Sequence, residues 1–376
     1  MSIRAVLLAV LTVVAVAVPA NATTPATKFT AVTPQRVLDT RDGTGVGVEG
    51  DHLVLDLSGA VPAGTAAVVL NLTGAEANVD SVVIVWPDGE ARPNTSNLNV
   101  SQRQTAANLT TVSLPANRKL DVWVHGDLGV IADLAGYYAE TGSGYRGHAP
   151  QRVMDTRTGG GPVGPHGTTV LDLSSVLPAT ATAVVFNLTA TDTTASTFVT
   201  AWPDGIPRPS ASSLNLAPGQ TRANLVTVAL PASRKIDLYN HLGSVDLIAD
   251  VSGYYDSSGG DWFFPGPPRR VIDTRDSSPV GPGGVLNVDV SQQTVLSASA
   301  VAVNITATDA TASTFLTAWP TGFDRPDAST LNLGAGQTVP NMALVSLNQK
   351  SFSVYNLAGA VDVIVDIAGY FSPSQP

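Results

Sequence analysis

One charged hexapeptide occurs three times in the sequence and keeps two arginines, an aspartate and a threonine each time. It reads RVLDTR at 36–41, RVMDTR at 152–157 and RVIDTR at 270–275. Guanidinium and carboxylate groups at this spacing can form ion pairs or hold a charged ligand. A catalytic motif is usually needed once per active site, so the repetition favours a role that every copy needs for itself.

Each copy ends in an apolar segment that carries a single aspartate before Gly-Tyr-aromatic, as at Val130–Tyr138. A buried carboxylate is costly unless it is paired and hydrogen-bonded. We therefore predict a structural clamp in which one hexapeptide arginine pairs with this aspartate, while the other arginine holds the hexapeptide aspartate or turn carbonyls. A ligand site is the alternative. The clamp residues are Arg36, Asp39, Arg41, Asp133, Arg152, Asp155, Arg157, Asp250, Arg270, Asp273, Arg275 and Asp366.

A second recurring element, Trp-Pro-x-Gly, precedes an Arg-Pro dipeptide and predicts a candidate ligand-binding surface. Tryptophan rings at turn entrances could stack on sugar rings, with the arginines flanking them; the alternative is that each indole covers its own domain. These residues are Trp86, Arg92, Trp202, Arg208, Trp319 and Arg325. Recurring amides such as Asn71, Asn99, Gln104 and Asn108 either satisfy loop backbone groups or bind sugar hydroxyls.

The sequence predicts no catalytic site, no metal site and no cofactor. Of five histidines, only His125 and His241 occupy equivalent positions in two copies. Gly45–Gly50 formally matches GxGxxG, but no helix pattern follows it. No GxSxG, HExxH or EF-hand pattern is present.

The repeated landmarks recur at a spacing of 116 or 117 residues, which predicts three tandem domains after a leader. We expect a signal peptide at 1–22 and repeats at 23–141, 142–259 and 260–376. Short valine-rich segments separated by Gly, Pro, Asp and Asn predict an all-β fold. The expected fold is three tandem β-sandwich domains of jelly-roll or Greek-key type, with a closed barrel as the alternative.

Composition restricts the setting in which such a protein works. Arg4, an apolar run over 5–18 and Ala20-Asn21-Ala22 fit a secretory signal peptide. No later segment approaches the ~20 apolar residues of a membrane span, and the chain has no cysteine. The net charge of −10 argues against nucleic acid as a partner. We expect a secreted, extracellular protein.

The motif order RVLDTR, VVxNLTATD, WPxGxxRPxxSxLN, GQTxxN and DVxGYY resembles a β-repeat module of secreted actinobacterial proteins, often attached to cell-wall hydrolases and peptidases. The resemblance covers essentially the whole chain after residue 22, three times. It implies an accessory extracellular module and carries no catalytic residue. Copy one departs from the pattern at Gly74–Ala77, where the other copies read Ala-Thr-Asp.

These observations predict a secreted, non-enzymatic protein that binds carbohydrate or cell wall multivalently. The expected partner is an extracellular polysaccharide or cell-wall component, because linked weak sites gain avidity. The alternative is a structural or adhesive surface protein, whose repeats act as spacers, self-associate or pack around a pseudo-threefold axis.

Overall fold

The computed structural model describes residues 26–43, 47–49 and 52–373, so the expected signal peptide at 1–22 lies outside the described residues. Within these ranges the chain is all-β apart from a 3₁₀ turn, η1 (Thr274–Asp276). No helix of the described chain is long and apolar enough to span a membrane. The three sequence repeats are called copies one, two and three below.

The strands follow the same order in each copy. Copy one contains β1 (Lys28–Asp39), β2 (Gly47–Glu49), β3 (His52–Asp56), β4 (Ala67–Ala75), β5 (Ser81–Pro87), β6 (Leu98–Val100), β7 (Ala106–Ser113), β8 (Lys119–His125) and β9 (Gly129–Ala139). Copy two contains β10 (Gly144–Asp155), β11 (Thr168–Asp172), β12 (Ala181–Thr191), β13 (Thr197–Pro203), β14 (Leu214–Leu216), β15 (Arg222–Ala229), β16 (Lys235–Asn240) and β17 (Asp246–Asp256). Copy three contains β18 (Trp262–Asp273), β19 (Val285–Asp289), β20 (Ala300–Thr308), β21 (Thr314–Pro320), β22 (Leu331–Leu333), β23 (Val339–Ser346), β24 (Ser351–Asn356) and β25 (Asp362–Ser372).

Each copy contributes two antiparallel sheets, which we call its inner and outer sheets. The inner sheets have the strand orders β1-β9-β4-β7, β10-β17-β12-β15 and β18-β25-β20-β23. The outer sheets are β2-β3-β8-β5-β6, β11-β16-β13-β14 and β19-β24-β21-β22. In every inner sheet the first strand of the copy pairs with the last, which places the hexapeptide beside the strand that carries the aspartate.

Apart from the first strand of each copy, the inner strands are buried on both faces. Along β4, Val68, Leu70 and Leu72 belong to the core between the two sheets of copy one, whereas Ala67 and Val69 belong to a second core shared by all copies. Side chains alternate between the faces of a strand, so neighbouring residues enter different cores. The same division holds in copies two and three.

Six aromatic rings dominate this common core. An aromatic residue at the start of each copy packs on the aromatic residue that ends another copy. The centroid distances are 4.1 Å for Phe29–Tyr255, 4.3 Å for Tyr145–Phe371 and 4.2 Å for Phe263–Tyr138. Buried aromatic pairs add about 0.5–1.5 kcal/mol beyond their area burial, and each of these pairs joins two copies.

The glycine of the closing Gly-Tyr-aromatic motif makes room for these rings. A Cβ atom added to Gly136 would lie 2.2 Å from Phe29, and one added to Gly369 would lie 2.5 Å from Phe263. A side chain at this position would therefore displace the ring from the common core.

Three central asparagines, one from each copy, link the copies in a closed cycle of hydrogen bonds beside the aromatic cluster, which we call the asparagine ring. Asn224 donates to Asn71 of copy one over 2.8 Å and accepts from the Leu109 backbone over 2.9 Å. The equivalent bonds run from Asn341 to Asn187 and from Asn108 to Asn304, both at 2.9 Å. All three central side chains are fully buried. Each copy therefore satisfies buried polar groups of its neighbour.

The joints between copies are also paired. The Gly142–Gly144 joint, whose composition is typical of flexible linkers, contains Ser143, which exchanges backbone hydrogen bonds of 2.8 and 2.9 Å with Phe29. Thr27 pairs with Phe263, and Tyr145 pairs with Asp261. The chain start of each copy is thus held against another copy.

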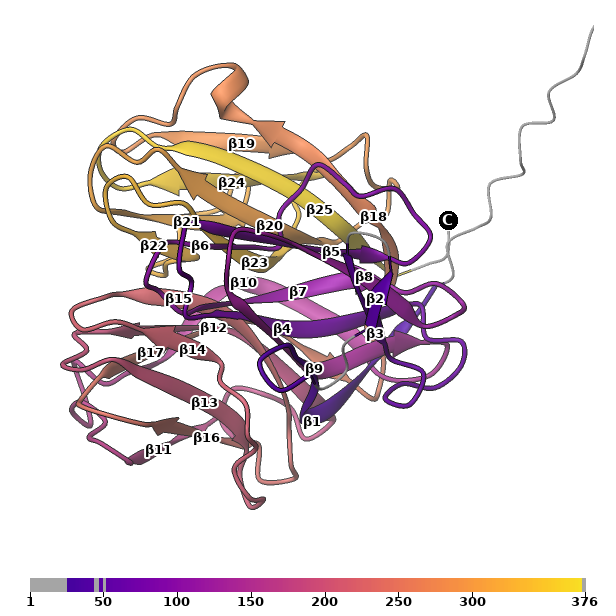
Figure 1. The fold of residues 1–376 in the computed structure, drawn as a ribbon, viewed down its shortest axis with the longest axis horizontal. Helices are drawn as coiled ribbons and strands as arrows, with labels where there is room; N and C mark the ends of the chain where they lie inside the picture. The colour runs from indigo at the N-terminus through magenta and orange to yellow at the C-terminus, as the bar shows by residue number, and fades with distance from the viewer. Residues whose placement is uncertain (1–25, 44–46, 50–51, 374–376) are drawn as a thin grey trace, which may run out of the picture.

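The expectation of three tandem β-sandwich domains is wrong. The six sheets surround one axis, with copy three (orange to yellow) and copy two (magenta to red) closing against copy one in Figure 1. In having six sheets about one axis the arrangement resembles a six-bladed β-propeller, not a row of domains. The physical reason is the second apolar face of each inner sheet, which another copy must cover.

Replacing Asn224 by Leu should lower the free energy of unfolding by about 3 kcal/mol. The substitution leaves the buried Leu109 backbone N–H and the side-chain oxygen of Asn71 without their hydrogen-bond partner. Urea denaturation would measure this loss. The control is Asn117→Ala on an exposed turn, with an expected loss within about 1 kcal/mol. Equal losses in the two variants would contradict a role of the ring in stability.

Candidate functional site

The hexapeptide of copy one forms a compact ion cluster. The Arg36 Nε donates to Asp133 over 2.7 Å and its Nη1 donates to Asp39 over 2.8 Å. Arg41 binds Asp39 through two parallel bonds of 2.8 and 2.7 Å. The carboxylates of Asp39 and Asp133 are buried. The first arginine of the motif thus reaches the last strand, and the second holds the motif's own aspartate.

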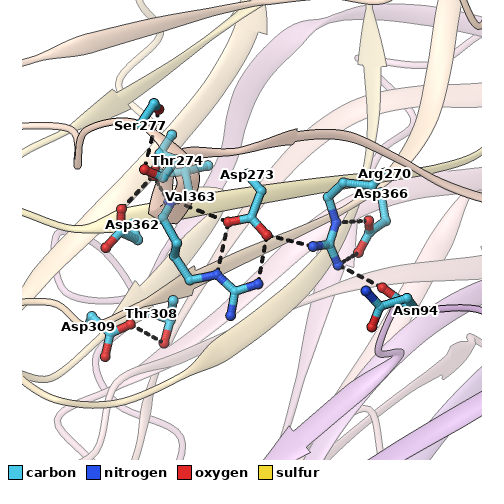
Figure 2. A network of polar contacts seen from close by, with 11 residues as sticks. Asn94, Arg270, Asp273, Thr274, Ser277, Thr308, Asp309, Asp362, Val363 and Asp366 are labelled. Carbon is cyan, nitrogen blue, oxygen red and sulfur yellow. Dashed lines mark hydrogen bonds and ion pairs between the residues drawn. The ribbon is translucent and has the colours of Figure 1, made fainter.

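The cluster is repeated in the other two copies. In copy three, Figure 2 shows Arg270 between Asp366 at 2.5 Å and Asp273 at 2.6 Å, and Arg275 lies 2.6 Å from Asp273. In copy two the corresponding distances are 2.9 Å for Arg152–Asp250, 3.5 Å for Arg152–Asp155 and 2.6 Å for Arg157–Asp155. The same residue positions therefore form the same contacts three times.

The first arginine also contacts the next copy. The Arg36 Nη2 donates to the Ser210 carbonyl of copy two over 2.9 Å, and Arg270 donates to the Asn94 carbonyl of copy one over 3.0 Å (Figure 2). Beside it, Asn71 donates to the Ser212 carbonyl over 2.7 Å. The cluster joins the first strand to the last and also anchors the neighbouring loop.

The threonine of the hexapeptide, which recurs in all three copies, also makes hydrogen bonds to its surroundings. The Thr40 hydroxyl accepts the Val130 backbone N–H over 2.9 Å. The Thr274 hydroxyl accepts from Val363 and donates to Asp362 over 2.7 Å (Figure 2). All polar positions of the hexapeptide thus have a structural partner.

Burial and hydrogen bonding shift the carboxyl pKa values in opposite directions. Two-point hydrogen bonding from Arg41 lowers the pKa of Asp39 to about 2 against the opposing effect of burial, and Arg275 likewise lowers the pKa of Asp273 to about 2. Burial raises the pKa of Asp133, while the Arg36 guanidinium opposes that shift.

The tryptophans do not form the expected stacking platform. Trp86, Trp202 and Trp319 are only 4–5% exposed. Each indole N–H donates to a carbonyl in the loop that follows, at 2.9 Å for Glu90, 3.0 Å for Ile206 and 2.9 Å for Phe323. The loop after the strand folds back over the ring, so none of these three tryptophans presents its ring face to a ligand.

The arginines of the Arg-Pro dipeptides cover a different aromatic ring. Arg92 lies 4.0 Å from the ring centroid of Trp123, Arg208 lies 3.6 Å from Tyr239, and Arg325 lies 4.0 Å from Tyr355. Sequence reasoning missed these rings, although an aromatic residue recurs at this position in β8, β16 and β24. Cation–π contacts of this kind fix the Arg-Pro loop on the outer sheet.

Hollows lie at equivalent places between neighbouring copies. The first, of about 300 Å³, lies between copies one and two and is called groove one; its lining includes Arg36, Arg41, Phe198, Ser212 and Asn215. The second, of about 190 Å³, lies between copies two and three and is called groove two; its lining includes Arg152, Arg157, Phe315, Ser329 and Asn332. The ion clusters therefore form one wall of each groove, and the neighbour's outer sheet and loop form the other.

The grooves combine groups that recognise polar ligands. The second arginine is accessible, since the side chains of Arg41 and Arg157 are 48% and 44% exposed. A half-buried phenylalanine, an asparagine amide and threonine hydroxyls lie nearby. In ligand sites a small number of placed polar groups fix the orientation of the ligand. Sequence reasoning missed the grooves because each wall comes from a different copy.

No family model matches the chain, and no curated protein matches it. Among the solved structures that match the chain, the following three all have low TM-scores. The CBM22-1–CBM22-2 tandem domain of Paenibacillus barcinonensis Xyn10C has 11% identity and a TM-score of 0.21, and the match covers 60% of this chain and 93% of that chain. A triple jelly-roll protein of an archaeal virus has 9% identity and a TM-score of 0.19, and the match covers 93% of this chain and 91% of that chain. A protein of Sulfolobus Turreted Icosahedral Virus has 10% identity and a TM-score of 0.18, and the match covers 88% of this chain and 86% of that chain. Similarities at this level show neither the family nor the function of this chain.

Replacing Arg36 by Ala should lower the free energy of unfolding by about 3–5 kcal/mol, because Asp133 would remain buried without its cation. Arg41→Ala in the same hexapeptide is the matched control, with an expected loss of about 1 kcal/mol, because its side chain is half exposed. Chemical denaturation would compare the two. A loss for Arg36→Ala no larger than that for Arg41→Ala would refute the clamp.

The lowered pKa of Asp39 predicts a pH dependence. Its stabilising contribution is fully present above the unfolded value of 3.8 and is lost as the pH falls toward about 2. Arg41→Gln should move the pKa of Asp39 up toward its ordinary value and shrink the loss of stability between pH 4 and 2. Carboxyl NMR titration and unfolding at several pH values would measure both; an unchanged Asp39 pKa would contradict the assignment to Arg41.

Proposed function

We propose that this is a secreted, non-catalytic protein that binds carbohydrate or cell-wall polymer in the grooves between its copies. The apolar leader and the resemblance of its motifs to secreted actinobacterial β-repeats support secretion. The buried tryptophans move the binding site away from the Trp-Pro turns and into grooves one and two.

One observation carries the proposal: two grooves that share an arginine, an asparagine and a phenylalanine at equivalent positions lie between different pairs of copies. In both, an exposed arginine, an asparagine amide and a phenylalanine ring surround a hollow large enough for a sugar unit. Arginine and amide groups can bind sugar hydroxyls, and an aromatic ring suits the apolar patch of a sugar. The clamp arginines thereby combine both roles considered for the hexapeptide.

The closed arrangement suits multivalent binding. Grooves one and two are held in a fixed relation by the common core, so a polymer that occupies one groove presents its next units to the other at high effective concentration. Two weak sites on one rigid body would then retain a long polysaccharide better than either site alone.

A purely structural or adhesive role is the second candidate. The closure of three copies around one buried aromatic and asparagine core favours it, because such closure gives a rigid unit whether or not a ligand binds. The two candidates differ in whether the grooves hold a saccharide.

The test is a polysaccharide pull-down and glycan array with a Phe198→Val and Phe315→Val double variant. Copy one carries Val82 at the equivalent position, so both substitutions suit the fold. Loss of both rings should weaken binding about tenfold or more, since each ring contact is worth about 0.5–1.5 kcal/mol and about 1.4 kcal/mol corresponds to a factor of ten.

Phe323→Val is the control, because Phe323 is 63% exposed and is not part of the groove two lining. This control should bind as the unmodified protein does. Unchanged binding by the double variant would move the site out of the grooves. No binding of the unmodified protein to any polysaccharide would overturn the proposal in favour of the structural role.

A further inference from the structure

Groove one continues into a side hollow. A second hollow of about 250 Å³ adjoins it and shares the lining residues Thr105, Phe198 and Asn215. The remaining lining of this side hollow includes Arg103 and Gln104 of copy one and Gln220 and His241 of copy two. The boundary between copies one and two therefore offers a continuous path with polar groups from both copies.

Two basic residues at this boundary, Arg103 and Arg222, have no basic counterpart in the other copies. Copies two and three carry Gly219 and Gly336 where copy one has Arg103. Arg222 in β15 corresponds to Ala106 in copy one and Val339 in copy three. In the other copies these two positions hold a glycine and a small apolar residue, so both arginines depart from the pattern of the internal repeat.

Arg222 is a buried cation with no carboxylate partner among the residues that the structure describes. It is 7% exposed, its Nη2 donates to the Gln104 side-chain oxygen over 2.5 Å, and its Nε has no partner among the described residues. Burial lowers its pKa to about 10. A buried unpaired charge is unfavourable, and a nearby anion would relieve that cost.

Gln104 connects this buried cation to the side hollow. Its carbonyl oxygen accepts from Arg222, which leaves the amide nitrogen as the donor that can serve a ligand in the hollow. Arg103 lies exposed next to it. An anion in the side hollow would therefore meet a direct arginine contact, an oriented amide and a second positive charge behind that amide.

The acids nearby do not neutralise this end of the path. Asp39 and Asp133 are already bound by Arg36 and Arg41, and Glu76 lies in the lining of groove one but not of the side hollow. Asp80 accepts from the Gln102 backbone N–H and also lies outside the lining of the side hollow. Groove two is less positive, because its lining holds two arginines and exposed Asp327 in the place of Ser210, whereas the lining of groove one holds three arginines and Glu76. The positive character is thus local, in a chain whose net charge is −10.

We propose that the path between copies one and two binds an acidic glycan by an oxyanion, carboxylate or phosphate, that lies against Arg103 and the Gln104 amide in the side hollow. Arg222 acts as a positioning residue, since it orients Gln104 and adds its charge from behind. This inference rests on the proposed function and assigns the ligand class of one of its two grooves. Groove two does not share the preference.

The test is calorimetric titration of the full chain with three probes of equal length: oligogalacturonate, oligo(glycerol phosphate) and a neutral malto-oligosaccharide. At least one charged probe should bind tenfold or more tightly than the neutral one, and which of them does so distinguishes carboxylate from phosphate. The Arg103→Gly and Arg222→Val double variant should reduce charged-probe affinity to the neutral level. Both substitutions introduce the residues of the other copies, so the fold should persist, which thermal unfolding would verify.

Arg269→Gln is the matched control, because it removes one exposed positive charge in copy three, outside both hollows. It should leave the preference unchanged; an equal loss in this control would mean non-specific attraction and overturn the inference. Equal affinity of the unmodified chain for charged and neutral probes would overturn it while leaving glycan binding intact. Absence of binding to all three probes would reject it, and the wider array would then decide the proposed function separately.

Discussion

Each inner sheet is apolar on both of its faces, and only one of these faces can be covered by the outer sheet of the same copy. The other face must be covered by the two remaining copies, which creates the common core of six aromatic rings. The buried polar groups at this junction are satisfied by the asparagine ring across the copy boundaries. Apolar burial supplies the driving force, while the asparagines fix how the copies meet.

The ion clusters lie at the edge of the same junction, and this place explains how stability and a binding surface arise from the same residues. Arg36 is held by Asp133 in its own copy and donates to Ser210 in the next. Its neighbour Arg41 is satisfied by Asp39 alone and remains half exposed. The wall of groove one is therefore pre-organised by the fold, so the arginines of this wall would not have to become ordered when a ligand binds.

Much of the local structure could be read from residue types. The apolar setting of Asp133 required a cation, and the hexapeptide carried the arginines that the structure places beside it. The tryptophan interpretation failed because exposure depends on where the following loop folds, and the loop from Pro87 to Glu90 returns over Trp86. The aromatic partner of Arg92 was missed because Trp123 lies about thirty residues away and meets it only across the folded sheet.

The sequence by itself determined the threefold repetition, the all-β character and the need to neutralise one aspartate in each copy, because these follow from residue type and spacing along one strand. Only the tertiary structure decided that the copies close around one axis and that grooves form between them. Closure depends on contacts between residues more than a hundred positions apart, such as Asn224 with Asn71 and Phe29 with Tyr255. No local pattern encodes such a pairing, since either member alone is compatible with an ordinary buried core.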